Sequence, residues 1–84
     1  MNKERRKSIA KARDMVAEAL SLVEVARDDE QDAFDCMPDN LQQSERGDRL
    51  EENVQALEEI IGALEGAFDE VEDIWSLSIW FHHR

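Results

Sequence analysis

The strongest constraint on the fold is an unbroken apolar repeat in the second half of the chain. Between residues 50 and 75 a large apolar side chain recurs at alternating steps of four and three. This spacing aligns the side chains along one helix and is typical of coiled coils and helix bundles. The stripe consists of Leu50, Val54, Leu57, Ile61, Leu64, Phe68, Val71 and Trp75. Ile60, Ala67 and Ile74 widen it on one side, which favours a bundle over a two-stranded coil.

The first half of the chain predicts another long helix, over residues 3–36. Ala, Leu, Glu, Arg and Lys are common in this segment, and all are strong helix formers. Its large apolar residues fall on one broad arc of the helix. They are Ile9, Met15, Val16, Leu20, Leu22 and Val23, whereas Val25 falls outside the arc. Ala12, Ala19 and Ala26 recur every seven residues at the centre of the arc, where small side chains would let a partner helix approach closely.

Residues 37–44, between the two helices, have the composition of a turn. Met37 precedes Pro38, the only proline, and is therefore biased away from the α region. Asp39 and Gln42 have the spacing of a capping box, which predicts a short helical turn with Asp39 as its N-cap. Ser44 is the expected N-cap of the second long helix, over residues 45–80.

Two helices of about 35 residues, each about 50 Å long, must fold back antiparallel when so short a segment joins them. We therefore predict one all-α domain over residues 1–84, an antiparallel two-helix hairpin. A single hairpin exposes one side of each apolar stripe, and pairing into a dimeric four-helix bundle would cover it. Gly62 and Gly66 lie near the back of the second helix and indicate either close contact or local flexibility. Gly47, in its first turn, costs less than an interior glycine.

Charge is divided unevenly along the chain. Residues 1–13, the basic arm, carry six basic side chains and one acid, a balance of +5. Residues 14–73 carry twenty acids and three arginines, a balance of −17. The formal net charge of −11 disfavours binding to nucleic acid or anionic membranes and favours a basic protein partner. We expect the arm to lie beside the last acidic turns, where it would fix the orientation of the helices. A nucleic-acid-binding arm is the alternative. Those acidic turns hold Glu65, Asp69, Glu70, Glu72 and Asp73.

The second helix carries many acidic residues away from its apolar stripe. Rows of carboxylates on a rigid helix can imitate the phosphates of DNA and occupy the basic groove of a nuclease, a restriction enzyme or a CRISPR effector. The alternative is a charged surface that serves only solubility, although a balance of −17 over sixty residues exceeds that need. The candidate acidic face consists of Glu51, Glu52, Glu58, Glu59, Glu65, Asp69, Glu70, Glu72 and Asp73.

The segment IWSLSIWF, residues 74–81, has six large apolar side chains in eight positions. As a helix it is apolar on nearly every side, so aliphatic stems of the basic arm and a second subunit would have to surround it. As a strand it would pair with another chain, and as a binding peptide it would anchor a partner through its tryptophans. The candidate residues for self-association or partner binding are Ile74, Trp75, Leu77, Ile79, Trp80 and Phe81.

No set of residues has the spacing of a catalytic or metal site. Asp28, Glu30 and Asp32 begin like a calcium loop, but Ala33 and Asp39 stand where glycine and glutamate are needed. The single cysteine and two adjacent histidines lack zinc-ligand spacing. We therefore expect that the protein has no enzymatic activity and binds no metal ion or cofactor. One cysteine, no signal-peptide pattern and no apolar run of about 20 residues predict a cytoplasmic protein of a bacterium or an infected cell.

The stretch FDCMPDNLQQSERGDRLEENVQALEEIIGALEGAFDEVEDI resembles a widespread group of small, acidic, uncharacterised helical proteins of bacteriophages and prophages. Members of that group have an acidic helix, a Phe-Asp-x-x-Pro turn, a Leu-Gln-x-Ser-Glu-Arg-Gly junction and a long helix rich in Glu, Ala, Leu and Ile. The resemblance covers about residues 30–74 and implies a phage or prophage source and a helical fold. IWSLSIWFHHR departs from the pattern, in which the Glu/Ala-rich helix continues. The matching motif residues are Phe34, Asp35, Pro38, Leu41, Gln42, Ser44, Glu45, Arg46 and Gly47.

These features predict a non-enzymatic phage or prophage accessory protein that acts by binding other proteins. In its specific form the hypothesis is a homodimer that inhibits a basic, nucleic-acid-processing host defence enzyme by mimicking nucleic acid. A structural or assembly scaffold that only oligomerises is the alternative. A further alternative is an antitoxin whose DNA-binding arm contains Lys3, Arg5, Arg6 and Lys7.

Overall fold

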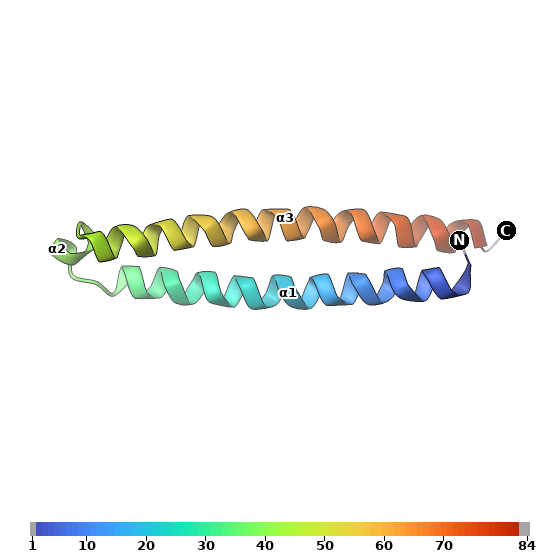
Figure 1. The fold of residues 1–84 in the computed structure, drawn as a ribbon, viewed down its shortest axis with the longest axis horizontal. Coiled ribbons are helices and arrows are strands. Elements are labelled where there is room, and N and C mark those ends of the chain that lie inside the picture. The colour runs from blue at the N-terminus through green and yellow to red at the C-terminus, as the bar shows by residue number, and fades with distance from the viewer. Residues whose placement is uncertain (1, 83–84) are drawn as a thin grey trace.

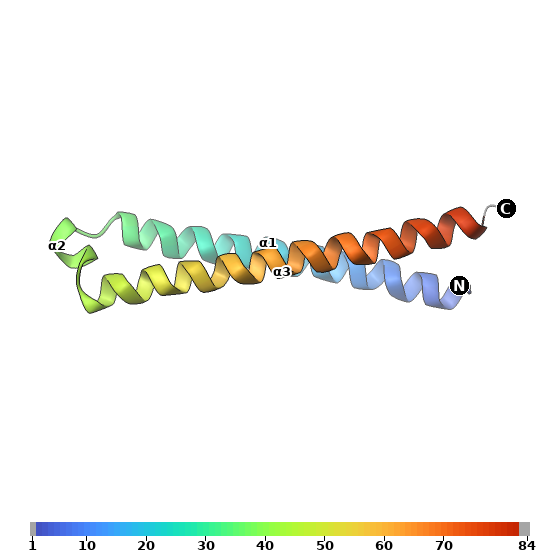
Figure 2. The ribbon, with the colours of Figure 1, turned by 90° about the horizontal axis from the view of Figure 1, so that it is seen from above.

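The protein is an antiparallel helical hairpin in a computed structural model that describes residues 2–82, with side chains to residue 77 (Figure 1). Its elements are α1 (Lys3–Asp35), the short α2 (Asp39–Gln42) and α3 (Glu45–His82). Helices α1 and α3 lie side by side along a rod of 64 × 14 × 14 Å (Figures 1 and 2). Helix α2 closes one end, the turn end, and the start of α1 lies beside the last turns of α3 at the other, the open end. The predicted hairpin is confirmed.

The helix boundaries lie close to the expected ones. Helix α1 ends at residue 35 instead of 36, and α3 continues to residue 82 instead of 80. Asn2 caps α1, because its Oδ1 accepts a hydrogen bond of 2.8 Å from the backbone N–H of Arg5. Within residues 2–82, no helix combines the length and the apolar character needed to cross a membrane.

One row of residues on each long helix faces the other helix, and the two rows together form the seam. All seam side chains are at least partly buried, and Val54 and Ile61 are the most buried, at 6% and 7% exposed. Because the hairpin has only two long helices, its core is a single layer of side chains. On α3 the seam is the predicted stripe from Leu50 to Trp75. On α1 it has the same spacing and consists of Ile9, Arg13, Val16, Leu20, Val23, Arg27, Glu30 and Phe34.

The broad apolar arc predicted for the first helix divides into two rows, and only one belongs to the seam. Met15 and Leu22 lie outside the seam and are 61% and 65% exposed. The alanines expected at the centre of the helix contact lie at its edge, and Ala26 is exposed. The expectation that the alanines form the centre of the contact is therefore wrong for this hairpin. An antiparallel helix pair needs one row of residues per helix, spaced alternately by four and three, and α3 packs on the row next to the alanines.

Helix α2 begins one residue earlier than a capping box at Asp39 requires, so that prediction is wrong. Pro38 occupies the N-cap with φ −58° and ψ 149°, and no side chain caps the helix. Proline fits this position because its ring favours such a φ. Gln42, the expected second member of the box, instead donates from Nε2 to the carbonyl oxygen of Phe34 at 3.1 Å. This bond ties α2 to the last turn of α1.

Ser44 caps α3 as predicted. Its Oγ accepts a hydrogen bond of 3.4 Å from the N–H of Gly47, and its hydroxyl donates to the carbonyl oxygen of Leu41. Gly47 is buried against the backbone of Gln42. A Cβ at residue 47 would lie 2.8 Å from the Cα and 2.6 Å from the carbonyl carbon of Gln42, and closer still to the carbonyl oxygen. The turn therefore requires glycine at this position, a role that its place in the first helical turn did not predict.

Gly62 and Gly66 differ from Gly47, because a Cβ at either position would meet open space. Close contact within the hairpin therefore does not explain them. We expect Gly62→Ala and Gly66→Ala each to raise the free energy of unfolding by about 1 kcal/mol, since alanine favours the helix and restricts the unfolded chain. Urea unfolding followed by circular dichroism measures the change. A loss of stability at either position would indicate that another surface packs on these glycines.

Candidate protein-binding surface

The hairpin presents a different surface on each side of the seam. Residues one position before a seam residue point to one side of a helix, and residues one position after it point to the other. In an antiparallel pair, the "before" rows of the two helices share one side of the hairpin. The structure shows this directly, because Ala26 of α1 and Asn53 and Ala56 of α3, all "before" residues, line one hollow.

The side formed by the "before" rows is the apolar flank. It contains five of the seven large apolar side chains that are exposed among residues with described side chains. These are Met15 (61% exposed), Leu22 (65%), Ile60 (46%), Ile74 (46%) and Leu77 (57%). Most of the remaining members are alanines. The rows are Ser8, Ala12, Met15, Ala19, Leu22, Ala26, Asp29 and Ala33 on α1, and Arg49, Asn53, Ala56, Ile60, Ala63, Ala67, Glu70, Ile74 and Leu77 on α3.

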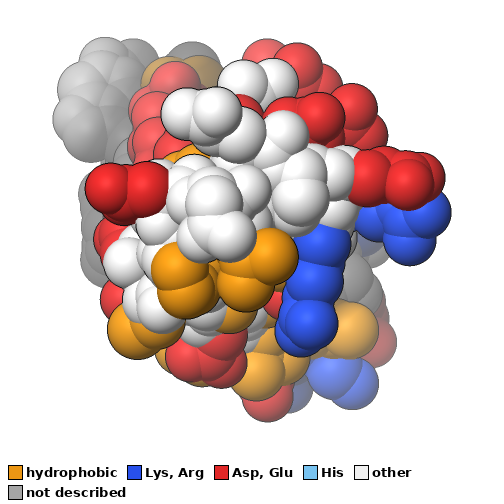
Figure 3. Space-filling view, turned by 90° about the vertical axis from the view of Figure 1, so that its left-hand side faces the viewer, with side chains coloured by type: hydrophobic (Ala, Val, Ile, Leu, Met, Phe, Trp, Pro, Cys, Tyr) orange, Lys and Arg blue, Asp and Glu red, His pale blue; other side chains and the backbone are white. Residues whose placement is uncertain are grey.

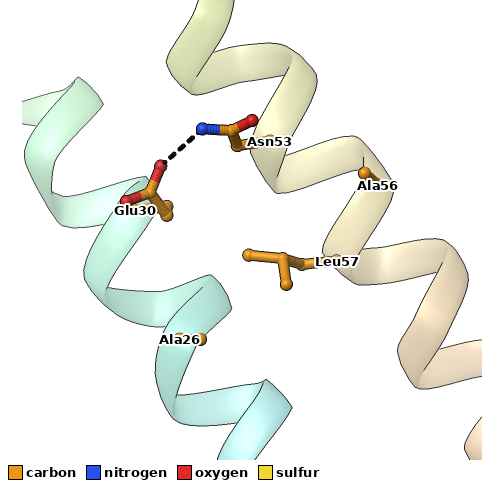
Figure 4. A pocket seen from close by; sticks show the side chains of 5 residues that line it. All are labelled: Ala26, Glu30, Asn53, Ala56 and Leu57. Carbon is orange, nitrogen blue, oxygen red and sulfur yellow. Dashed lines mark hydrogen bonds between the residues drawn. The ribbon is translucent and has the colours of Figure 1, made fainter.

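A hollow of about 340 Å³ lies on the apolar flank, toward the turn end (Figure 4). Its floor includes Leu57, and it is open because Ala26 and Ala56, on its two walls, carry only methyl groups. Asn53 Nδ2 donates to Glu30 Oε2 at 3.1 Å across one end. Since these two polar side chains bond to each other, the hollow offers mainly apolar surface to a visitor.

The side formed by the "after" rows is the acidic flank. Over residues 10–35 of α1 and 51–76 of α3, nine of its residues are acidic and none is basic, and Lys3 and Lys7 continue the α1 row toward the open end. Viewed onto the turn end, acidic side chains lie on several sides of the molecule, beside exposed apolar and basic side chains (Figure 3). The rows are Ala10, Asp14, Ala17, Ser21, Glu24, Asp28, Gln31 and Asp35 on α1, and Glu51, Gln55, Glu58, Gly62, Glu65, Asp69, Glu72 and Ser76 on α3.

The nine residues predicted as one acidic face are all exposed, but they do not share one side. Glu52, Glu59 and Asp73 lie on the outer side of α3, and Glu70 lies on the apolar flank. The other five lie on the acidic flank: Glu51, Glu58, Glu65, Asp69 and Glu72. Helix α1 contributes four acids that sequence reasoning missed, namely Asp14, Glu24, Asp28 and Asp35. Applying the same offset to the first helix would have found them, once its seam row was known.

The apolar segment at the open end is helical, so the strand interpretation is wrong. Trp75 is half-buried in the seam, and the guanidinium carbon of Arg13 lies 4.9 Å from the centroid of its ring. This is a cation–π contact, and it covers the ring with a residue of the basic arm. Ile74 and Leu77 remain exposed on the apolar flank. The side chains of Ile79, Trp80 and Phe81 lie outside the described residues.

The predicted pairing of the basic arm with the acidic turns stays a prediction. Arg13, the last residue of the arm, contacts Trp75, which follows Asp73 in α3. Among the described residues, every ion pair joins neighbours on one helix. These pairs are Arg13–Asp14, Arg27–Asp28 and Arg49–Glu45, and such exposed pairs contribute little stability.

The described side chains contain no group of three or more His, Cys, Asp or Glu residues arranged to hold a metal ion. No protein-family model, no curated protein and no solved structure matches the chain significantly. The two flanks are therefore the features of this molecule from which a function can be inferred: one long acidic surface and, opposite it, one long apolar surface.

Proposed function

We propose that this chain is a non-enzymatic, protein-binding accessory protein of a bacteriophage or prophage. It acts in the cytoplasm by presenting its acidic flank to the basic groove of a host nucleic-acid-processing enzyme. The phage source rests on the resemblance of residues 30–74. The binding mode rests on one observation: nine acids lie together on one side of a rigid rod, with no base among them over residues 10–35 and 51–76.

The density of negative charge supports this mode. The net charge of residues 14–73 is −17. Residues 45–73 form the first part of α3, and most of residues 14–44 lie alongside this part. This part of α3 is about 43 Å long, which gives roughly one net negative charge per 2.5 Å, compared with one per about 1.7 Å along duplex DNA. A groove that binds DNA electrostatically would therefore meet a comparable field.

We further propose that two copies of the chain form a dimeric four-helix bundle, and the apolar flank supports this. Exposed large side chains and alanine rows on one side are what a four-helix bundle buries between its helix pairs. A dimer would cover this side and leave both acidic flanks accessible. The same surface also supports a second candidate function, a scaffold that only self-associates. The antitoxin alternative has less support, because the basic arm forms the first turns of α1 and Arg13 packs on Trp75.

Affinity capture from host lysate at low and high salt tests the proposal. The immobilised chain should retain a nucleic-acid-processing enzyme, which raised salt releases and duplex DNA displaces. Raising salt from 0.1 M to 1 M shortens the screening length from about 10 Å to about 3 Å, so an electrostatic contact should weaken strongly. Retention that is insensitive to both salt and DNA would contradict the proposal.

Two variants with the same change in net charge provide the control. The flank variant replaces Glu51, Glu58, Glu65 and Glu72 with Gln. The outer variant replaces Glu4, Glu18, Glu52 and Glu59, which lie on the outer sides of the helices, with Gln. We expect the flank variant to lower the affinity for the captured enzyme at least about tenfold and the outer variant to lower it less than about threefold. Equal losses would show that only total charge matters.

A further inference from the structure

We propose that a second copy of this chain packs on the apolar flank with its turn end against the open end of the first copy. The two-fold axis then runs perpendicular to the rod, near its middle. Each α1 lies against the α1 of the other copy, and each α3 against the other α3, in antiparallel pairs. This inference rests on the dimeric bundle proposed above and names the surface and the orientation that form it.

The shape of the apolar flank supports the opposite-end orientation. The hollow walled by Ala26 and Ala56 lies toward the turn end, whereas the exposed Ile74 and Leu77 lie on the same flank near the open end. In the opposite-end arrangement, Ile74 and Leu77 of each copy enter the hollow of the other copy. With both turns at the same end, the two hollows would face each other and stay empty, which well-packed interfaces avoid.

The charge distribution supports the same orientation. The basic arm lies at the open end, with a balance of +5. The last turns of α1 lie at the turn end and carry five acids and no base after Arg27: Asp28, Asp29, Glu30, Asp32 and Asp35. The opposite-end arrangement brings each arm over the acidic turns of the other copy. The same-end arrangement would place both arms together and both acidic ends together, which is repulsive.

The exposed area of the chain matches what such a pairing needs. The hairpin exposes 6376 Å², whereas a compact globular protein of 9.7 kDa exposes about 5,100 Å². The excess, roughly 1,300 Å² per copy, lies within the range that stable homodimer interfaces bury, about 1,000–2,500 Å² per partner. A second copy is therefore an occupant of suitable size for this flank.

The native Cys36 provides a direct test of the orientation. It is the only cysteine, it is exposed, and it lies at the turn end. Nitroxide labels on Cys36 should give an intermolecular distance near 50 Å by pulsed electron paramagnetic resonance, since about 34 helical residues then separate the two labels along the bundle. The same-end arrangement predicts about 15–25 Å, from neighbouring helix spacings and the label arms. A short distance would overturn the proposed orientation while leaving the dimer intact.

A matched pair of variants tests whether the apolar flank is the interface. Leu22 lies on the flank and Val25 lies on the outer side of α1, and both are more than half exposed in the hairpin. We expect the wild type and Val25→Glu to sediment at twice the chain mass of 9.7 kDa. We expect Leu22→Glu to raise the dissociation constant of the dimer at least about tenfold. A monomeric wild type would overturn the dimer itself, and equal behaviour of the two variants would overturn the choice of face. Neither result depends on capture of the basic partner.

Discussion

Gly47→Ala should be among the most destabilising single substitutions in this chain. The added Cβ meets the backbone of Gln42, which cannot rotate away as a side chain could. Either α2 or the first turn of α3 must shift, which costs about 1–3 kcal/mol. The shift also weakens the Ser44 cap and the bond from Gln42 to Phe34, each worth about 1 kcal/mol. We expect a loss of about 3 kcal/mol and a fall in Tm of roughly 15 °C, measured by thermal unfolding followed by circular dichroism.

Gly62→Ala and Gly66→Ala are the controls for this prediction, because the same substitution is expected to raise the free energy of unfolding at these positions. All three glycines lie in α3, but only Gly47 faces another backbone. A Gly47→Ala protein as stable as the wild type would mean that α2 and α3 do not approach each other in this way. A loss of stability at Gly62 and Gly66 as well would mean that another surface packs on these two glycines.

Ile61→Ala should produce the second large effect. Ile61 is 7% exposed and is one of the two most buried apolar side chains of the seam. Truncating a buried isoleucine removes apolar contacts and leaves a cavity, which costs about 2–5 kcal/mol. The core is only one layer deep, so neighbouring side chains can partly collapse into the gap, and we expect about 3 kcal/mol. Urea unfolding at a fixed protein concentration measures the loss.

Val25→Ala is the matched control for the core. Val25 is 58% exposed on the outer side of α1, and we expect its truncation to change the free energy of unfolding by no more than about 0.5 kcal/mol. Comparable losses at Val25 and Ile61 would mean that residues 50–75 do not pack on α1 through the seam. The comparison therefore tests the pairing of the long helices independently of the turn.

The sequence was sufficient to predict the hairpin, because the four-three repeat from Leu50 to Trp75 can be satisfied only by helix packing. It was not sufficient to choose the partner row on α1. That row contains Arg13, Arg27 and Glu30, so apolar periodicity alone favoured a broader arc that included Met15 and Leu22. Long polar side chains in the seam bury their stems and keep their charged ends in water, so a search based on apolar residues does not find them.

Only the α3 part of the candidate site could be predicted, because the row of α1 that faces α3 was not known from the sequence. Once α3 is a helix, Glu51, Glu58, Glu65 and Glu72 follow as one row, because they recur every seven residues on one side of the stripe. Their partners on α1 depend on the antiparallel pairing, which the sequence of one helix does not contain. The capping error at Asp39 arose similarly. The local spacing fits a capping box, but Pro38 already supplies the N-cap, and Gln42 reaches across the turn to α1.

The closed turn end and the open end give the rod a direction of assembly. Contacts next to α2 close the shortest loops and therefore lose the least chain entropy when they form, whereas contacts at the open end join residues more than sixty positions apart. The hairpin should zip from the turn outward and fray from the open end inward. The exposed Ile74 and Leu77 lie at the end that forms last. Partner recognition by these two residues is then coupled to completion of the hairpin, because the surface that carries them is complete only when the whole rod is folded.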